Sequence, residues 1–123
     1  MGFAGAEIQE LIRYAEDTYG AEPEFLWAKS PQNAVLRHRN GGKWFAALLN
    51  VRKKQLGIPG AGCIDILNVK CDPKLVASLL DGKSRLPAYH MNKEHWITLL
   101  LDGSVPADEL HALLHMSYEL TKP

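Results

Sequence analysis

The sequence has few of the features that mark secreted or membrane proteins. Its only cysteines are Cys63 and Cys71, too few for a disulfide-stapled miniprotein, and we expect both to be buried thiols in a reducing compartment. The longest unbroken apolar run, 44–49, is far shorter than the roughly 20 residues of a transmembrane helix. The N-terminus lacks the pattern of a secretory signal. We therefore expect a cytoplasmic protein that does not bind membranes.

The motifs of common catalytic and metal sites are also missing. Gly57, Gly60 and Gly62 lack the Gly-Lys-Ser/Thr ending of a phosphate-binding loop. No GxSxG, HExxH or CxxC pattern occurs, and the cysteines have no partner at zinc-binding spacing. The sequence thus predicts no cofactor, no metal and no catalytic residue, and we do not expect an enzyme.

What is present is the composition of one globular domain. Hydrophobic residues make up 46% of the chain and charged residues 23%, which are ordinary values for a soluble domain. A chain of 123 residues can bury a full core without disulfides or metal. No repeat and no Pro/Gly/Ser linker divides it. We predict a single domain spanning residues 1–123.

The formal net charge is zero, but the charges are unevenly distributed. Residues 1–24 and 94–123 are acidic, whereas residues 25–93 hold twelve basic and only three acidic side chains. Between Phe25 and Ile64 there is no acid at all. Such a basic block can mark a surface that contacts phosphates. The alternative is that acidic terminal helices simply neutralise a basic sheet.

Hydrophobic periodicity predicts an α+β fold with two layers, in which helices pack on an antiparallel sheet of about five strands. Apolar residues at 8, 11, 12, 15 and 19 mark a first helix that ends at Gly20. Asp72-Pro73 starts a second helix and Pro106 a third. Asn40-Gly41-Gly42-Lys43 is a hairpin turn. The predicted strands are 34–39, 44–50, 64–70, 86–89 and 95–101, which gives the order α-β-β-β-α-β-β-α.

Three further expectations concern parts of the chain with weaker patterns. Residues 25–27 have the composition of a short strand, and residues 51–63 that of a long, mobile, basic loop. Trp44 lies in an apolar strand, which favours the core. The second helix should bury Leu75, Val76, Leu79 and Leu80.

The segment from Leu86 to Leu120 resembles the MmcQ/YjbR family of small bacterial proteins. Its specific pieces are Pro87 to Asn92, His95-Trp96-Ile97, Asp102-Gly103 and Ser117-Tyr118. Two elements earlier in the chain also match the family: LNVKCDP at 67–73, and Gly42-Lys43 with Phe45-Ala46. The resemblance implies a CyaY-like, secretion-chaperone-like fold, a double-wing DNA-binding role and no catalytic residues. The family-motif residues, whose role the resemblance leaves open, are Tyr89, His90, Asn92, Lys93, His95, Trp96, Ser117 and Tyr118.

The first functional hypothesis is double-stranded DNA binding. Phosphate contacts would come from a basic hairpin and a basic loop. His38, Asn40 and Gln55 would add polar contacts near bases, and Trp44 would stack on a base if it were exposed. The basic candidates are Arg37, Arg39 and Lys43 in the hairpin and Arg52, Lys53 and Lys54 in the loop.

Two other hypotheses remain. One is a chaperone-like adaptor that binds a protein partner, with the chain itself a monomer or a weak dimer. The other is a ligand-binding or catalytic site, which would need His90, Asn92, His95 and Tyr118 to converge. For the segment 89–96, a structural turn capped by Asn92, with Tyr89 and Trp96 packed, is favoured over catalysis.

Overall fold

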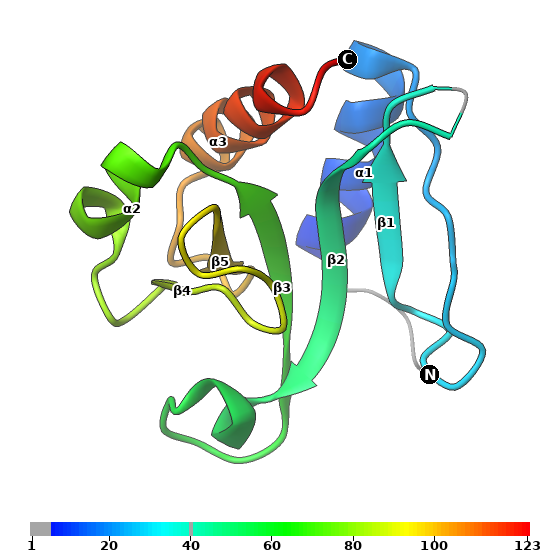
Figure 1. Ribbon diagram of the computed structural model, residues 1–123. Helices are drawn as coiled ribbons and strands as arrows, with labels where there is room; N and C mark the ends of the chain where they lie inside the picture. Colours follow the sequence, from blue (N-terminus) through cyan, green and yellow to red (C-terminus); the bar gives the residue numbers. More distant parts are fainter. Residues whose placement is uncertain (1–5, 40) are drawn as a thin grey trace.

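A computed structural model describes residues 6–39 and 41–123. Three α-helices, five strands and one short 3-10 helix form in these ranges (Figure 1). The helix–strand order is the predicted one, which confirms the α+β assignment. The elements are α1 (Ala6–Tyr19), β1 (Ala34–Arg37), β2 (Trp44–Arg52), η1 (Lys53–Leu56), β3 (Cys63–Lys70), α2 (Pro73–Leu79), β4 (Arg85–Pro87), β5 (Trp96–Leu100) and α3 (Ala107–Leu120).

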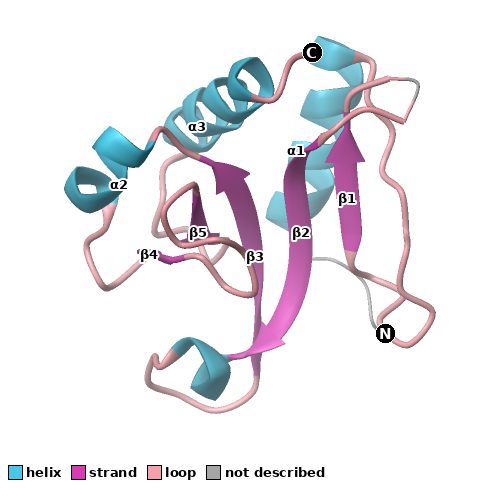
Figure 2. Cartoon of the chain, in the orientation of Figure 1, coloured by secondary structure: helices cyan, strands magenta, loops and turns pink. Residues whose placement is uncertain are grey.

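The strands make one open antiparallel sheet in the order β1-β2-β3-β5-β4. Helices α1 and α3 lie against the same face of this sheet (Figure 2). The main core fills the space between them, with Phe45, Leu67 and Leu99 from the strands against Leu11 and Leu114 from the helices. No helix in the described ranges is long and apolar enough to cross a bilayer.

Ser117 joins α3 to the two central strands. Its side chain is fully buried, and its hydroxyl accepts a hydrogen bond from the Lys70 backbone N–H at 2.8 Å. The same hydroxyl donates to the Phe45 carbonyl oxygen at 2.6 Å. Phe45 lies just beyond the last β2–β3 pair, Ala46 with Val69, and Lys70 is in the last β3–β5 pair, opposite Trp96. One side chain therefore supplies both partners and fixes where α3 sits on the sheet.

Arg85 joins the edge strand β4 to α3. Its guanidinium donates to both carboxylate oxygens of Glu109, at 2.6 and 2.5 Å, and to Asp81 at 2.7 Å. The hydrogen bond from Arg85 lowers the pKa of the Glu109 carboxyl. Three backbone N–H groups of the turn, from Arg85, Lys83 and Ser84, hold the pKa of Asp81 far below its usual range.

Several sequence-based expectations were wrong in detail. Residues 25–27 are not a strand, because only Glu24 bridges to Val35 before the chain turns away. The segment 51–63 is shorter as a loop than expected, since β2 continues to Arg52, η1 follows, and β3 starts at Cys63. Cys63 is exposed at this sheet end, whereas Cys71 is buried. Leu75 is 44% exposed, because α2 has only seven residues and lies at the edge of the core.

Replacement of Ser117 by alanine should destabilise the protein by about 1–3 kcal/mol, because it leaves two buried backbone groups without a partner. The measurement is the urea midpoint at constant m value. Ser78→Ala is the control, since Ser78 is exposed and bonds only within α2, and it should change stability by no more than about 0.5 kcal/mol. Equal small changes in both variants would show that Ser117 does not hold α3 in place.

Candidate functional site

Among residues 6–39 and 41–123, no α-helix covers the face of the sheet opposite α1 and α3, and this face carries a hollow of about 650 Å³. Its floor is formed by Ala47, Leu49 and Val51 of β2 and by Asn68 of β3. These residues share this face because side chains alternate along a strand. A second, smaller apolar cluster of Val51, Ile66 and Leu100 with their neighbours lies beside it, under η1.

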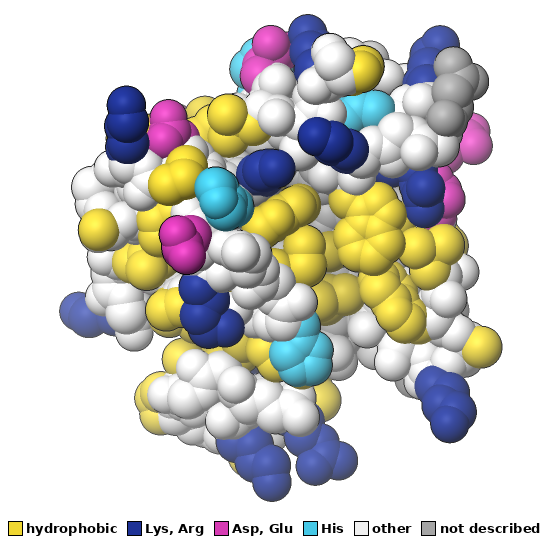
Figure 3. All heavy atoms as spheres, in the orientation of Figure 1, with side chains coloured by type: hydrophobic (Ala, Val, Ile, Leu, Met, Phe, Trp, Pro, Cys, Tyr) yellow, Lys and Arg dark blue, Asp and Glu magenta, His cyan; other side chains and the backbone are white. Residues whose placement is uncertain are grey.

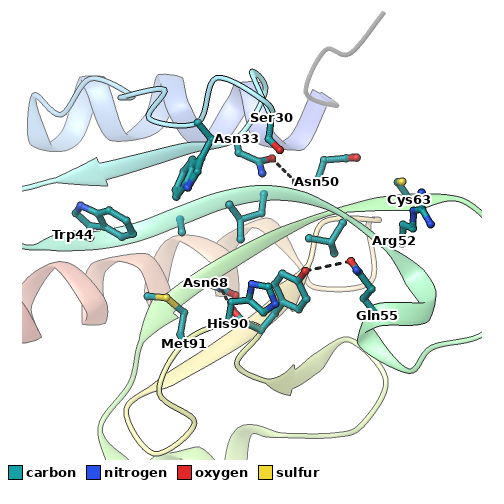
Figure 4. Close-up of a pocket in the computed structure, with 15 residues that line it drawn as sticks. Ser30, Asn33, Trp44, Asn50, Arg52, Gln55, Cys63, Asn68, His90 and Met91 are labelled. Carbon is teal, nitrogen blue, oxygen red and sulfur yellow. Dashed lines mark hydrogen bonds between the residues drawn. The ribbon is translucent and has the colours of Figure 1, made fainter.

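Two segments that are distant in sequence form the walls of the hollow (Figure 4). One wall is the turn before β1, which contributes Trp27 and Ser30. The other wall is the β4–β5 loop, residues 88–95, which contributes Tyr89, His90 and Met91. Trp44 lies at one end of the hollow, and Arg52, Gln55 and Cys63 lie at the other.

A buried polar network fixes the β4–β5 loop over the sheet. Asn68 and Thr98 are neighbours on β3 and β5, and both are fully buried. The Thr98 hydroxyl accepts from the Tyr89 N–H at 2.8 Å and donates to Asn68 Oδ1 at 2.5 Å. Asn68 Nδ2 then donates to the Tyr89 carbonyl oxygen at 2.9 Å. The backbone of Tyr89 is thus held on both sides, and the wall of the hollow has a defined position.

The rest of the loop is ordered by its own contacts. Asn92 Oδ1 accepts from the N–H groups of Glu94 and His95, at 2.8 and 3.2 Å, which agrees with the predicted cap. The Lys93 ammonium donates to the Ala88 carbonyl oxygen at 2.9 Å. The Tyr89 hydroxyl donates to Gln55 at 3.2 Å and so reaches η1.

His90 completes this wall in an unusual backbone conformation. Its φ is 57°, in the left-handed region that residues other than glycine seldom adopt. Its ring stacks on Tyr89, with the ring centroids 3.9 Å apart and the planes at 9°. The side chain of His90 is exposed and borders the hollow.

The two predicted basic groups lie at opposite ends of β2, a strand of nine residues that spans about 27 Å. In the hairpin group, Arg37 pairs with Glu24 at 2.9 Å, and Arg39 lies against Gly20 beyond the C-terminal end of α1. Lys43 is exposed next to Trp44. Asn40 lies outside the described residues.

At the other end of β2, Arg52 and Lys54 are exposed, and Lys53 is half-buried with its ammonium near Gly60. Figure 3 shows the face that bears the hollow, with Lys and Arg side chains standing around an indented hydrophobic area. None of the described residues that line the hollow is acidic.

Two residues expected near the site lie elsewhere. His38 is buried and hydrogen-bonds to Thr121 and to the Tyr118 carbonyl oxygen. Tyr118 packs on the helix side, with its ring 4.2 Å from that of Tyr19. His90, Asn92, His95 and Tyr118 therefore do not converge on one pocket, because Tyr118 lies across the sheet from the β4–β5 loop.

Sequence reasoning placed Trp44 wrongly and missed Trp27 and Asn68. Trp44 is half-buried rather than in the core, because it lines the open hollow on that face of β2. Its ring packs edge-on against Trp27, with centroids 5.9 Å apart. The signal for Asn68 was present in the sequence, since a polar residue between Leu67 and Val69 in a buried strand needs specific partners.

A family model described as YjbR matches residues 16–120. The uncharacterized protein YyaQ of Bacillus subtilis is 40% identical over 114 residues, which cover 93% of this chain and 97% of YyaQ. A crystal structure of a Pseudomonas syringae protein has 43% sequence identity and a TM-score of 0.89, and the match covers 93% of this chain and 97% of that one.

A more distant solved structure has the same fold. It is a Deinococcus radiodurans protein, with 26% sequence identity and a TM-score of 0.69, and the match covers 92% of this chain and 76% of that one.

Replacement of Thr98 by valine keeps the shape of the side chain but removes the hydroxyl at the centre of the network. The Tyr89 N–H and Asn68 Oδ1 should then lack a partner, at a cost of about 1–3 kcal/mol. Hydrogen exchange of the Tyr89 amide should become faster, as measured by NMR. Thr18→Val, at an exposed position of α1, is the matched control. Unchanged protection of Tyr89 in the Thr98 variant would contradict the role of the network.

Proposed function

The chain belongs to the YjbR family, and from that membership and the form of its open sheet face we propose that it binds DNA. The DNA-contacting surface is the hollow and its basic borders. This surface, rather than the helix layer, is favoured because the helix layer is built from the acidic ends of the chain. Phosphates and acidic helices repel one another.

The observation that carries the proposal is the charge distribution around the hollow. Arg52 lines the hollow at its η1 end, Lys54 and Lys93 line two smaller hollows that share residues with it, and Lys43 precedes Trp44 in the sequence. No carboxylate is among its described lining residues. A surface of this kind attracts a polyanion and repels a cationic partner.

These cations would provide affinity rather than sequence readout. Lysine and arginine bind phosphate oxygens and release counterions, so the affinity falls steeply as salt increases. Contacts to phosphate fix the position of the protein on DNA without reading the bases. Arg37 and Arg39 contribute less in this scheme, because they already contact Glu24 and the end of α1.

The test is fluorescence anisotropy of a labelled duplex of about 20 base pairs at two salt concentrations. The wild type should bind more weakly at high salt. The double variant Arg52→Ala/Lys54→Ala should bind more weakly at low salt, and the slope of log K against log salt should fall by about 2. Lys53 is left unchanged in this variant because it is half-buried.

The matched control is Lys74→Ala/Lys83→Ala, which removes two exposed cations that do not border the hollow. It should leave affinity and salt slope near the wild-type values. An equal loss in both double variants would show that binding follows net charge alone. Absence of binding at low salt, with protein well above micromolar, for this duplex and for its separated strands would overturn the proposal.

A second candidate function is an adaptor for a protein partner. The observation in its favour is the exposed segment before β1, where Phe25 is 57% and Leu26 46% exposed next to Trp27. Exposed apolar residues that follow one another in the chain mark contact surfaces more often than isolated ones do. This candidate predicts association that is insensitive to salt, which separates it from DNA binding in the same titration.

A further inference from the structure

Four aromatic rings border the hollow, in two pairs on different sides. Trp27 and Trp44 meet edge to face, with centroids 5.9 Å apart and planes at 79°. Tyr89 and His90 are stacked, with planes at 9°. Trp27 comes from the turn before β1, Trp44 from β2, and the other pair from the β4–β5 loop. The fold has thus gathered rings from three segments around one concave surface.

A Watson–Crick duplex cannot use these rings. Its bases are stacked on one another, and only their edges are accessible in the grooves. An unpaired strand presents the faces of its bases, which stack on aromatic side chains regardless of sequence. The hollow of about 650 Å³ has the size of a site for a small organic group such as a base.

We propose that the hollow receives the bases of an unpaired nucleic-acid strand, which lies along β2 with its phosphates toward Lys43, Arg52 and Lys93. This inference rests on the proposed function and specifies the form of the ligand. The nearly 27 Å of β2 is long enough for about four nucleotides, the lower end of the range for sheet-based single-strand binders.

Two asparagines that line the hollow, Asn68 and Asn33, support binding without sequence preference. The Asn68 amide is already occupied, because its oxygen accepts from Thr98 and its nitrogen donates to Tyr89. Asn33 Oδ1 accepts from the Asn50 N–H at 2.9 Å. With these groups engaged, stacking and charge are the main contacts that we expect, and both tolerate any base.

His90 offers a test that does not threaten the fold. Asparagine tolerates the left-handed conformation at φ 57°, so His90→Asn removes the ring without imposing backbone strain. Its matched control is His95→Asn, an exposed histidine of the same loop that does not line the hollow. Trp27→Ala is the second variant, at a position that is 36% exposed and outside any strand.

The experiment compares three labelled probes by fluorescence anisotropy at low salt: oligo(dT) and oligo(rU) of about 12 nucleotides, and a duplex of about 20 base pairs. At least one of the two unpaired strands should bind more tightly than the duplex. Whether oligo(dT) or oligo(rU) binds more tightly shows whether the site prefers deoxyribose or ribose. His90→Asn and Trp27→Ala should each weaken that binding by about 5- to 150-fold, the usual effect of removing a stacking ring. Duplex binding should change little in both, and His95→Asn should match the wild type.

Tighter binding of the duplex, or unpaired-strand binding that survives both ring substitutions, would overturn this inference and leave the proposed function in place. Failure of all three probes to bind would overturn both. Circular dichroism and the urea midpoint of each variant confirm that a loss of affinity is not a loss of folding.

Discussion

In the part of the chain that the structure describes, the α-helices cover one face of the sheet only, and the features of the candidate site follow from this constraint. On the covered face, strands and helices bury a common core that includes Leu67 and Leu114. On the other face, apolar strand residues such as Ala47 and Leu49 have no second layer above them. Two loops and η1 close over part of that face, and the hollow is the part that they leave open.

The walls are stable because polar groups inside the sheet hold them. The hydroxyl and amide of Thr98 and Asn68 satisfy both backbone groups of Tyr89 and so determine where its ring and that of His90 lie. On the helix side Ser117 has a similar role, because it links α3 to the ends of β2 and β3. Residues that carry the family resemblance therefore support opposite faces of one sheet: Ser117 on the helix side, and Asn68, Tyr89 and His90 at the hollow.

Sequence patterns predicted the order of elements because helix and strand periods are local properties. The stripe of Ile8, Leu11 and Ala15 in α1 is an example, since all three are buried. The hollow was not predictable in the same way, because Trp27 and His90 meet it from segments far apart in the chain. Trp44 was misplaced for a related reason. An apolar strand indicates burial on two faces, and the sequence does not say that one of them lacks a covering layer.

The central claim is that the uncovered sheet face is the binding surface, and NMR of ¹⁵N-labelled protein tests it most directly. Titration with an unpaired oligonucleotide should shift the indole N–H signals of Trp27 and Trp44 and the amide signals of Tyr89 and His90. The indole signal of Trp96, which does not line the hollow, and the amides of α1 should stay in place. Shifts confined to the helices, or to Trp96, would contradict the account.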